Sequence, residues 1–467
     1  MNRVGPSVWR RFSSTSSSPT IVAKPAPSKA RHHVQIPDAS FPLGYSLTGV
    51  HCGVKKNPSV LDLTVILSTS SKPTSAAACF TRNAFLAAPV LVSQDVLEKS
   101  AGHVRAIVTN SGCANAVTGK QGLEDAWAMV KATDALLPKR TQSESVKDSH
   151  DTVVMSTGVI GQNLPISKIL SGISSLVPSS LGSDFAAWER AAKAFMTTDT
   201  FPKLRARTFS LGGQTFRMAG MDKGAGMIHP NMGPPTNPGQ LHATLLGCIL
   251  TDAAVSPQAL QSALTYAVER SFNSISVDGE MSTNDTIVVL ANGAAAGETK
   301  EIEEHDPLFP AFRKELTSFA AELAQLVVRD GEGATKFVTV SVEGAPTFTD
   351  AHRVASKIST SALVKTALYG EDANWGRILA ATGSVPLSTP IDPYRVNVTF
   401  VPADGTTPLP VLVRGEPELV DEVRAKEILS QEDFEIKVDL GLGSESAQYW
   451  TCDFSYEYVR INGDYRS

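Results

Sequence analysis

The stretch Ala243-Thr244-Leu245-Leu246-Gly247-Cys248-Ile249-Leu250-Thr251-Asp252-Ala253 places a threonine directly before an apolar run. Residues 245–250 have the length and composition of a buried β-strand. Similar apolar runs occur at residues 104–109 (VRAIVT) and 286–290 (TIVVL), and helical patterns lie between these runs. This alternation of strand-like and helix-like segments predicts an α/β protein.

The clearest predicted helix covers residues 311–329. Its apolar residues recur at spacings of three and four, at Phe312, Leu316, Phe319, Leu323 and Leu326. One face of this helix should therefore be buried. Two glycines in residues 330–336 end the helix, and a strand is predicted from Phe337. Two further helices are expected, one starting at Ser256-Pro257 and one through residues 185–195.

Composition excludes several classes of function. With 467 residues, 42% hydrophobic and 19% charged, the chain predicts a globular protein of two domains or lobes. It contains no apolar run long enough to span a membrane, and its formal charge of -5 gives no basic surface for nucleic acid. The five cysteines lack CxxC spacing and the histidines lack HExxH spacing, so we predict no metal site.

Residues 1–34 have the composition of a mitochondrial presequence. They contain a Ser/Thr-rich run at 13–18, no acidic residue, and six basic residues: Arg3, Arg10, Arg11, Lys24, Lys29 and Arg31. Arg-rich, Ser-rich segments without acids are typical of mitochondrial import signals. The segment Arg10-Arg11-Phe12-Ser13 resembles a matrix-peptidase site. We therefore predict that the protein is located in the mitochondrial matrix. The alternative is that residues 1–34 are a basic tail without a targeting role.

The residues around Thr244 suggest its chemistry. Upstream lies Lys223-Gly224-Ala225-Gly226-Met227-Ile228-His229-Pro230-Asn231-Met232, followed by the Pro- and Gly-rich segment 233–242, which predicts an exposed loop. A threonine hydroxyl is a weak nucleophile until a base removes its proton. A free α-amine, with an ordinary pKa of about 8, supplies such a base when the threonine begins a chain.

This arrangement resembles the cleavage region of the ornithine acetyltransferase family. The segment 233–242 is an insertion relative to the shorter bacterial pattern, and Thr244 is chosen as nucleophile because it alone in this region follows alanine and opens an apolar strand. The resemblance extends over nearly all of the chain after residue 34. It includes the segments 110–116 (NSGCANA), 156–161 (STGVIG), 197–200 (TTDT), 282–286 (STNDT), 330–336 (DGEGATK), 370–377 (GEDANWGR) and 458–467 (YVRINGDYRS).

The resemblance implies an architecture and a maturation step. It implies a two-lobed α/β sandwich with sheets packed between helices, similar to proteins with an N-terminal nucleophile. Self-cleavage between Ala243 and Thr244 would produce an N-terminal chain of residues 35–243 and a C-terminal chain of residues 244–467. The family further implies that the two chains stay together as a heterotetramer.

The resemblance also assigns roles to particular residues. Thr157 and Gly158 would form the oxyanion hole, although their segment alone predicts only a glycine turn after an apolar strand. Thr244 and five other residues would contact substrate: Thr197, Lys223, Glu332, Asn462 and Ser467. The charges of Lys223 and Glu332 suit an α-carboxylate and an amino group, and the alternative is that both are solvated surface charges.

The function implied is transfer of acetyl from N2-acetyl-L-ornithine to L-glutamate through an acetyl-threonine intermediate, in arginine biosynthesis. No cofactor is expected. Acetyl-CoA is a candidate second acetyl donor, and no residue in the sequence decides whether it is used. Two other hypotheses stay open. In one, the chain is a self-cleaved aminopeptidase or amidase in which water replaces glutamate. In the other, it is an uncleaved binding protein without enzymatic activity.

Overall fold

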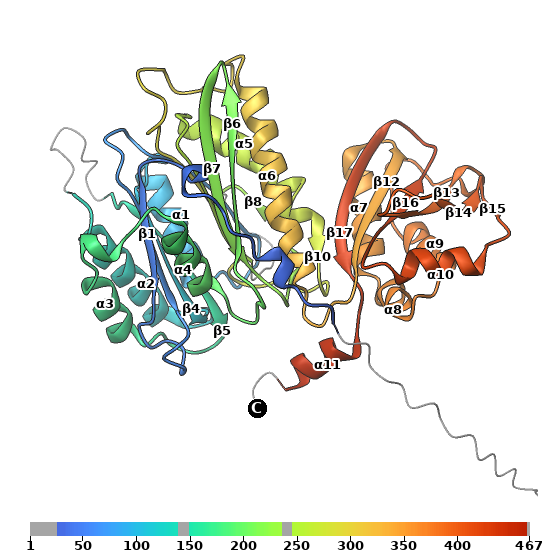
Figure 1. The fold of residues 1–467 in the computed structure, drawn as a ribbon, viewed down its shortest axis with the longest axis horizontal. Helices are drawn as coiled ribbons and strands as arrows, with labels where there is room; N and C mark the ends of the chain where they lie inside the picture. The colour runs from blue at the N-terminus through green and yellow to red at the C-terminus, as the bar shows by residue number, and fades with distance from the viewer. Residues whose placement is uncertain (1–25, 139–148, 236–244, 465–467) are drawn as a thin grey trace, which may run out of the picture.

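The computed structural model describes residues 26–138, 149–235 and 245–464. They form a large lobe with two β-sheets and a small lobe with one (Figure 1). The α/β, two-lobed architecture expected from the sequence is confirmed. Residues 330–336 connect helix α6 (Phe309–Arg329) of the large lobe to strand β12 (Phe337–Ala345) of the small lobe.

The first sheet of the large lobe has four strands in the order β1-β2-β4-β5. Its strands are β1 (Tyr45–Val50), β2 (Leu63–Ser68), β4 (Ala106–Cys113) and β5 (Thr152–Val159). The helices beside it are α1 (Ala88–Lys99), α2 (Gly119–Asp134), α3 (Ile166–Ser174) and α4 (Phe185–Phe195). Helix α4 contacts β1 and β2 and also β6 and β7 of the second sheet, so it lies between the two sheets.

The second sheet has six strands in the order β6-β7-β9-β11-β3-β8. They are β6 (Lys203–Leu211), β7 (Gln214–Lys223), β9 (Leu246–Thr251), β11 (Thr286–Ala291), β3 (Ser75–Thr81) and β8 (Met232–Gly233). Helices α5 (Pro257–Glu269) and α6 (Phe309–Arg329) pack against it. Strand β9 is buried on both faces. On one face Leu246, Cys248 and Leu250 pack in the core shared with the first sheet, and on the other Leu245 and Ile249 pack in the core under α5 and α6.

The small lobe is built on a seven-stranded sheet with its own core. In sheet order its strands are β10 (Ile275–Ser276), β17 (Glu445–Cys452), β12 (Phe337–Ala345), β16 (Asp433–Asp439), β13 (Asn397–Pro402), β14 (Leu409–Val413) and β15 (Glu416–Pro417). Its helices are α7 (Phe348–Thr360), α8 (Ala362–Gly370), α9 (Trp375–Gly383) and α10 (Glu422–Ser430). The last helix, α11 (Tyr456–Gly463), lies away from this sheet, below the junction of the lobes (Figure 1).

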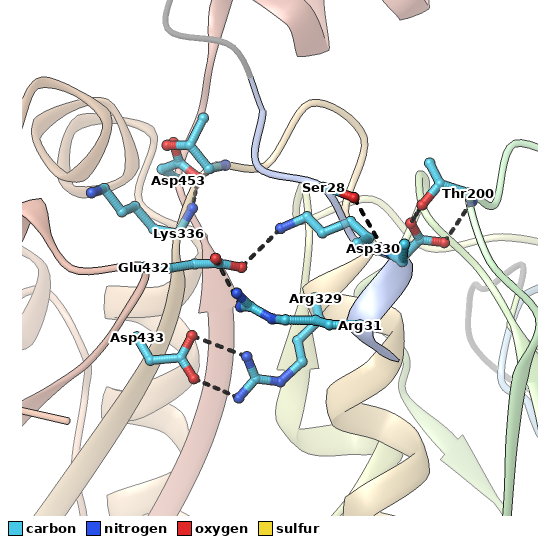
Figure 2. Close-up of polar contacts among 12 residues, drawn as sticks. Ser28, Arg31, Thr200, Arg329, Asp330, Lys336, Glu432, Asp433 and Asp453 are labelled. Atoms are coloured by element: carbon cyan, nitrogen blue, oxygen red, sulfur yellow. Dashed lines mark hydrogen bonds and ion pairs between the residues drawn. The ribbon is translucent and has the colours of Figure 1, made fainter. Parts of the chain in front are cut away.

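Short 3-10 helices complete the chain: η1 (Ala30–His32), η2 (Asp38–Ser40), η3 (Pro178–Ser180), η4 (Phe272–Ser274) and η5 (Pro393–Arg395). The segment that carries η1 bridges the lobes (Figure 2). Lys29 and Arg31 contact the carboxylate of Glu432 at 3.2 and 2.8 Å, and Arg205 of β6 donates to the His32 carbonyl at 3.1 Å. Residues 26–34, the end of the predicted presequence, therefore pack against the folded protein, and residues 1–25 lie outside the described part.

Most predicted elements are present, with corrected boundaries. The long helix starts at Phe309 because Pro310 occupies its first turn, and Ser256 caps α5 as expected. The segment 156–161 was predicted as a turn, but β5 continues through Val159 with an irregular register against Gly112 and Cys113 of β4. The loop predicted at 233–242 starts later than expected, because Gly233 pairs with Phe80 of β3. Residues 236–242 lie outside the described part.

Candidate active site

The end of strand β5 forms one wall of a cavity at the junction of the lobes. It carries Thr157 and Gly158, the two residues predicted to form an oxyanion hole. Gly158 has φ +128°, and a Cβ at this position would lie 2.3 Å from the carbonyl carbon of Gly112. Only glycine permits this approach of β5 to β4. The glycine that the sequence placed in a turn is thus required by the contact between two strands.

The end of strand β7 forms the second wall with Lys223. Its side chain is buried, and its Nζ donates to the Thr157 hydroxyl oxygen at 3.0 Å. Burial lowers the pKa of Lys223, and the carboxylate of Asp199 opposes this effect. A cation held in this way suits recognition of a substrate carboxylate, and it also polarises the Thr157 hydroxyl.

The turn after helix α6 forms the third wall with Glu332, which is 8% exposed. Its amide donates to the Ala225 carbonyl at 2.8 Å, and its carboxylate accepts from the Asn462 side-chain amide at 2.8 Å. A Cβ on Gly226 would lie 2.4 Å from the same carboxylate, so this glycine makes room for Glu332. These contacts hold the Glu332 carboxylate in place, and its charge is opposite to that of Lys223.

The segment after helix α4 supplies Thr197. Its amide donates to a carboxylate oxygen of Asp199 at 2.8 Å, so the threonine is fixed through its backbone. Asp199 is fully buried, and Lys203 is the strongest influence that holds its pKa below the usual range against the effect of burial. The sequence identified Thr197 by resemblance and gave no reason to single out Asp199.

Six predicted residues line one cavity of about 280 Å³, a volume suited to an amino acid. They are Thr157, Gly158, Thr197, Lys223, Glu332 and Asn462. The sequence missed the other lining residues, which are Val159, Ile160, Thr198, Gly226 and Met227. Met227 has a positive φ of 55°, a backbone conformation rare for residues other than glycine. Its amide donates a hydrogen bond of 2.6 Å to the carboxylate of Asp278.

The predicted residues Ala243, Thr244 and Ser467 lie outside the described part of the chain. Leu245, which follows Thr244 in sequence, is described, and its amide donates to a carboxylate oxygen of Asp285. Strand β9 then runs antiparallel to β7 with Leu246 opposite Lys223. The start of β9 therefore lies beside a residue that lines the cavity.

Asp285 is a buried acid that sequence reasoning missed. Its second carboxylate oxygen has no hydrogen-bond partner among the described residues. Burial raises its pKa well above the usual range, and the cation of Lys223 opposes this. Asp285 belongs to the TNDT segment, but Asn and Asp clusters usually mark turns, so nothing in this motif indicated that the side chain is buried.

Residues 26–138, 149–235 and 245–464 contain no group of three or more His, Cys, Asp or Glu side chains that could hold a metal ion. No helix in the same ranges is long and apolar enough to cross a membrane.

Comparison with known proteins identifies the family. The sequence pattern of the ArgJ family matches residues 46–467. The chain belongs to the ArgJ family. ArgJ relatives are similar over almost the whole length: the mitochondrial arginine biosynthesis bifunctional protein ArgJ of Postia placenta is 72% identical, covering 99% of both chains. The protein of the same name from Candida albicans is 53% identical, covering 91% of this chain and 94% of the relative.

Two solved structures of similar sequence are shorter than this chain. The crystal structure of ArgJ from Bacillus halodurans is 36% identical with a TM-score of 0.42, covering 46% of this chain and 96% of that one. Ornithine acetyltransferase from Mycobacterium tuberculosis, in complex with ornithine, is 32% identical with a TM-score of 0.35. It covers 43% of this chain and 98% of that one.

Proposed function

We propose that this chain transfers acetyl from N2-acetyl-L-ornithine to L-glutamate, in the mitochondrial matrix and as a step of arginine biosynthesis. Membership of the ArgJ family and the high identity to mitochondrial relatives support this function. The observation that carries the proposal is the pairing of Leu246 with Lys223, because it sets the start of β9, two residues after Thr244, beside the cavity.

The two opposite charges of the cavity recognise the substrate. Lys223 binds the α-carboxylate of ornithine or glutamate, and Glu332, held by Asn462, binds the side-chain amino group of ornithine. Thr197 and Ser467 contribute further substrate contacts. Both charges are buried, so each interacts with its partner more strongly than it would in water.

The first chemical step is self-cleavage. The Thr244 hydroxyl attacks the Ala243 carbonyl, the peptide C–N bond breaks, and an ester forms while the α-amine of Thr244 is released with a proton. Water then hydrolyses the ester, leaving a carboxylate at Ala243 and the free hydroxyl of Thr244. The reaction yields the chains 35–243 and 244–467, and the free α-amine of Thr244 becomes the general base.

Acetyl transfer repeats the same chemistry on the substrate. The Thr244 hydroxyl attacks the acetyl carbonyl of N2-acetylornithine, giving acetyl-Thr244 and ornithine with a free α-amine. The amine of glutamate then attacks the acetyl ester and restores the hydroxyl. Thr157 and Gly158 stabilise the oxyanion of both steps. Because the Thr157 oxygen accepts from Lys223, its own proton is left to donate to the oxyanion.

The assembly and the donors complete the proposal. The two chains remain associated, as a heterotetramer, and the enzyme needs no cofactor. Acetyl-CoA serves as a second acetyl donor, which would give the chain the two activities implied by the word bifunctional in the names of its relatives.

Intact mass and N-terminal sequencing of the wild type beside Thr244→Ala test the maturation, and glutamate-dependent release of ornithine tests the transfer. We expect two chains, the second starting at Thr244, and ornithine release only in the wild type. Glutamate-independent release of acetate and ornithine would instead indicate an amidase. A single uncut and inactive wild-type chain would refute the proposal and favour the binding protein.

A further inference from the structure

Three of the segments that line the cavity, those that carry Thr197, Lys223 and Glu332, meet at a buried cluster of charges that none of the predicted roles uses. Lys203, at the start of β6, has its Nζ 2.5 Å from a carboxylate oxygen of Asp199 and 2.6 Å from one of Asp330. All three side chains have 0% exposure. Burying ions costs several kcal/mol each, so a fully buried cluster of this kind is weak evidence for stability alone.

Each carboxylate of the cluster also holds backbone of the cavity wall. Asp199 accepts the amide of Thr197 and the amide of Gly224, the residue after Lys223, both at 2.8 Å. Asp330 lies two residues before Glu332 and accepts the Thr200 amide at 2.9 Å (Figure 2). One ammonium thus connects the three segments that carry the cavity's candidate substrate ligands Thr197, Lys223 and Glu332.

The cluster contains two carboxylates and one ammonium, and the cation of Lys223 in the cavity offsets the remaining negative charge. Asp199 lies near the cations of both Lys203 and Lys223, and Asp330 lies near that of Lys203. Asp199 opposes the loss of the proton from Lys223. Asp222, directly opposite Lys203 in the β6–β7 ladder, is buried without a hydrogen-bond partner among the described residues. Burial raises the pKa of Asp222 well above its usual range, which favours the uncharged form of this carboxyl group.

We infer that Asp199, Lys203 and Asp330 are positioning residues that set the separation between Lys223 and Glu332, and hence the length of the amino acid that the site accepts. This inference rests on the proposed function. A cation and an anion fixed at a set separation match ornithine, with three methylenes, better than its homologue lysine, with four. If the cluster is broken, the Glu332 turn can move relative to Lys223 and the discrimination by length falls.

The test compares kcat/KM for N2-acetylornithine and N2-acetyllysine, with glutamate as acceptor, in wild type, Lys203→Met and Lys203→Arg. Lys365→Met is the matched control. Lys365 is also fully buried, and its ammonium donates to Thr451 at 2.9 Å in the small lobe, outside the cavity lining. Thermal unfolding is measured for every variant.

We expect Lys203→Met to lower the ratio of kcat/KM for N2-acetylornithine to that for N2-acetyllysine at least tenfold, chiefly by raising KM for N2-acetylornithine. Lys203→Arg should recover part of this ratio. Lys365→Met should lower the unfolding temperature and leave the ratio within twofold of the wild type. If Lys203→Met does not fold, Asp330→Asn, which keeps the side-chain shape, gives the same measurement. An unchanged ratio in the folded variants would overturn the inference, whereas an inactive wild type would overturn the proposed function instead.

Discussion

The side-chain amide of Asn462, in the last helix, donates a hydrogen bond of 2.8 Å to the carboxylate of Glu332. The two residues are 130 positions apart in the chain. Helix α11 has no buried residue, so its position at the cavity depends on contacts such as this one rather than on a core of its own. Through Asn462, helix α11 therefore forms part of the wall of the cavity.

Replacing Asn462 by leucine should weaken binding of N2-acetylornithine more than turnover. Glu332 would lose a hydrogen bond to its charge, an effect of about 1.5 kcal/mol, which corresponds to roughly a tenfold rise in KM. Steady-state kinetics measure this. The control is Val459→Ala, because Val459 lies on the same helix with 68% exposure. Equal KM values in both variants would contradict a role for Asn462.

Thr157→Val should lower kcat about 100-fold, because the variant keeps the shape of the side chain and loses a donor to the oxyanion. Thr157→Ser retains the hydroxyl that accepts from Lys223 and should stay within tenfold of the wild type. The measurement is single-turnover formation of the acetyl-enzyme. The oxyanion role would be wrong if valine and serine had the same effect.

Asp285→Leu should slow self-cleavage roughly tenfold, since it removes the acceptor of the Leu245 amide next to the predicted cleavage bond. Asp285→Asn keeps an acceptor oxygen and should cleave faster than the leucine variant. Mass spectrometry of the fraction of uncut chain after synthesis in vitro follows the reaction. Cleavage of Asp285→Leu at the wild-type rate would show that the hydrogen bond between Leu245 and Asp285 does not orient the peptide bond that is cleaved.

Local patterns predicted the fold well where burial follows a simple period. The spacing of Phe312, Leu316 and Phe319 fixed the face of α6, and Ser256-Pro257 marked the start of α5. The sequence could not show that β5 continues through Gly158, because the cause is its contact with Gly112 of a neighbouring strand. Such contacts depend on tertiary structure and leave no periodic signal.

The candidate site was predictable only in part. Lys223 and Glu332 could be named from their motifs, and the structure brings both to one cavity. The buried charges behind them could not be named, because Asp199, Lys203 and Asp330 look like ordinary surface residues in sequence. Lys, Glu and Asp are rarely buried, so prior expectation pointed away from them.

The wild type should lose more stability on mild acidification than His229→Gln. Burial lowers the pKa of His229 to about 4, and His352 and Lys365 add to the effect. Between that value and the ordinary 6.5, the unfolded chain binds a proton that the folded protein does not, so the stability is complete above pH 6.5 and falls as the pH drops. By pH 5 the difference reaches about 2 kcal/mol.

Urea unfolding at pH 7 and pH 5 measures this loss. The control is His305→Gln, because His305 is exposed and its replacement should leave the loss unchanged. If His229→Gln and wild type lost the same stability between the two pH values, burial of His229 would not explain the acid sensitivity.

A chain starting at Gln35 should unfold a few degrees below a chain starting at Ala26. The shorter chain lacks Lys29 and Arg31, which both contact Glu432 across the lobe junction. Lys29 is largely buried, so its loss should cost more than that of an exposed pair. Differential scanning calorimetry compares the two. Equal unfolding temperatures would mean that the bridge adds no stability.

The six-stranded sheet places β9 and β11, which follow residue 243, between β7 and β3, which precede it. Cleavage at Thr244 would therefore produce two polypeptides interwoven in one hydrogen-bonded layer, and neither could leave without opening the core of the other. Mature molecules would not exchange their halves in solution. A damaged half could not be replaced by a fresh copy, so each molecule would be synthesised, used and degraded as a unit.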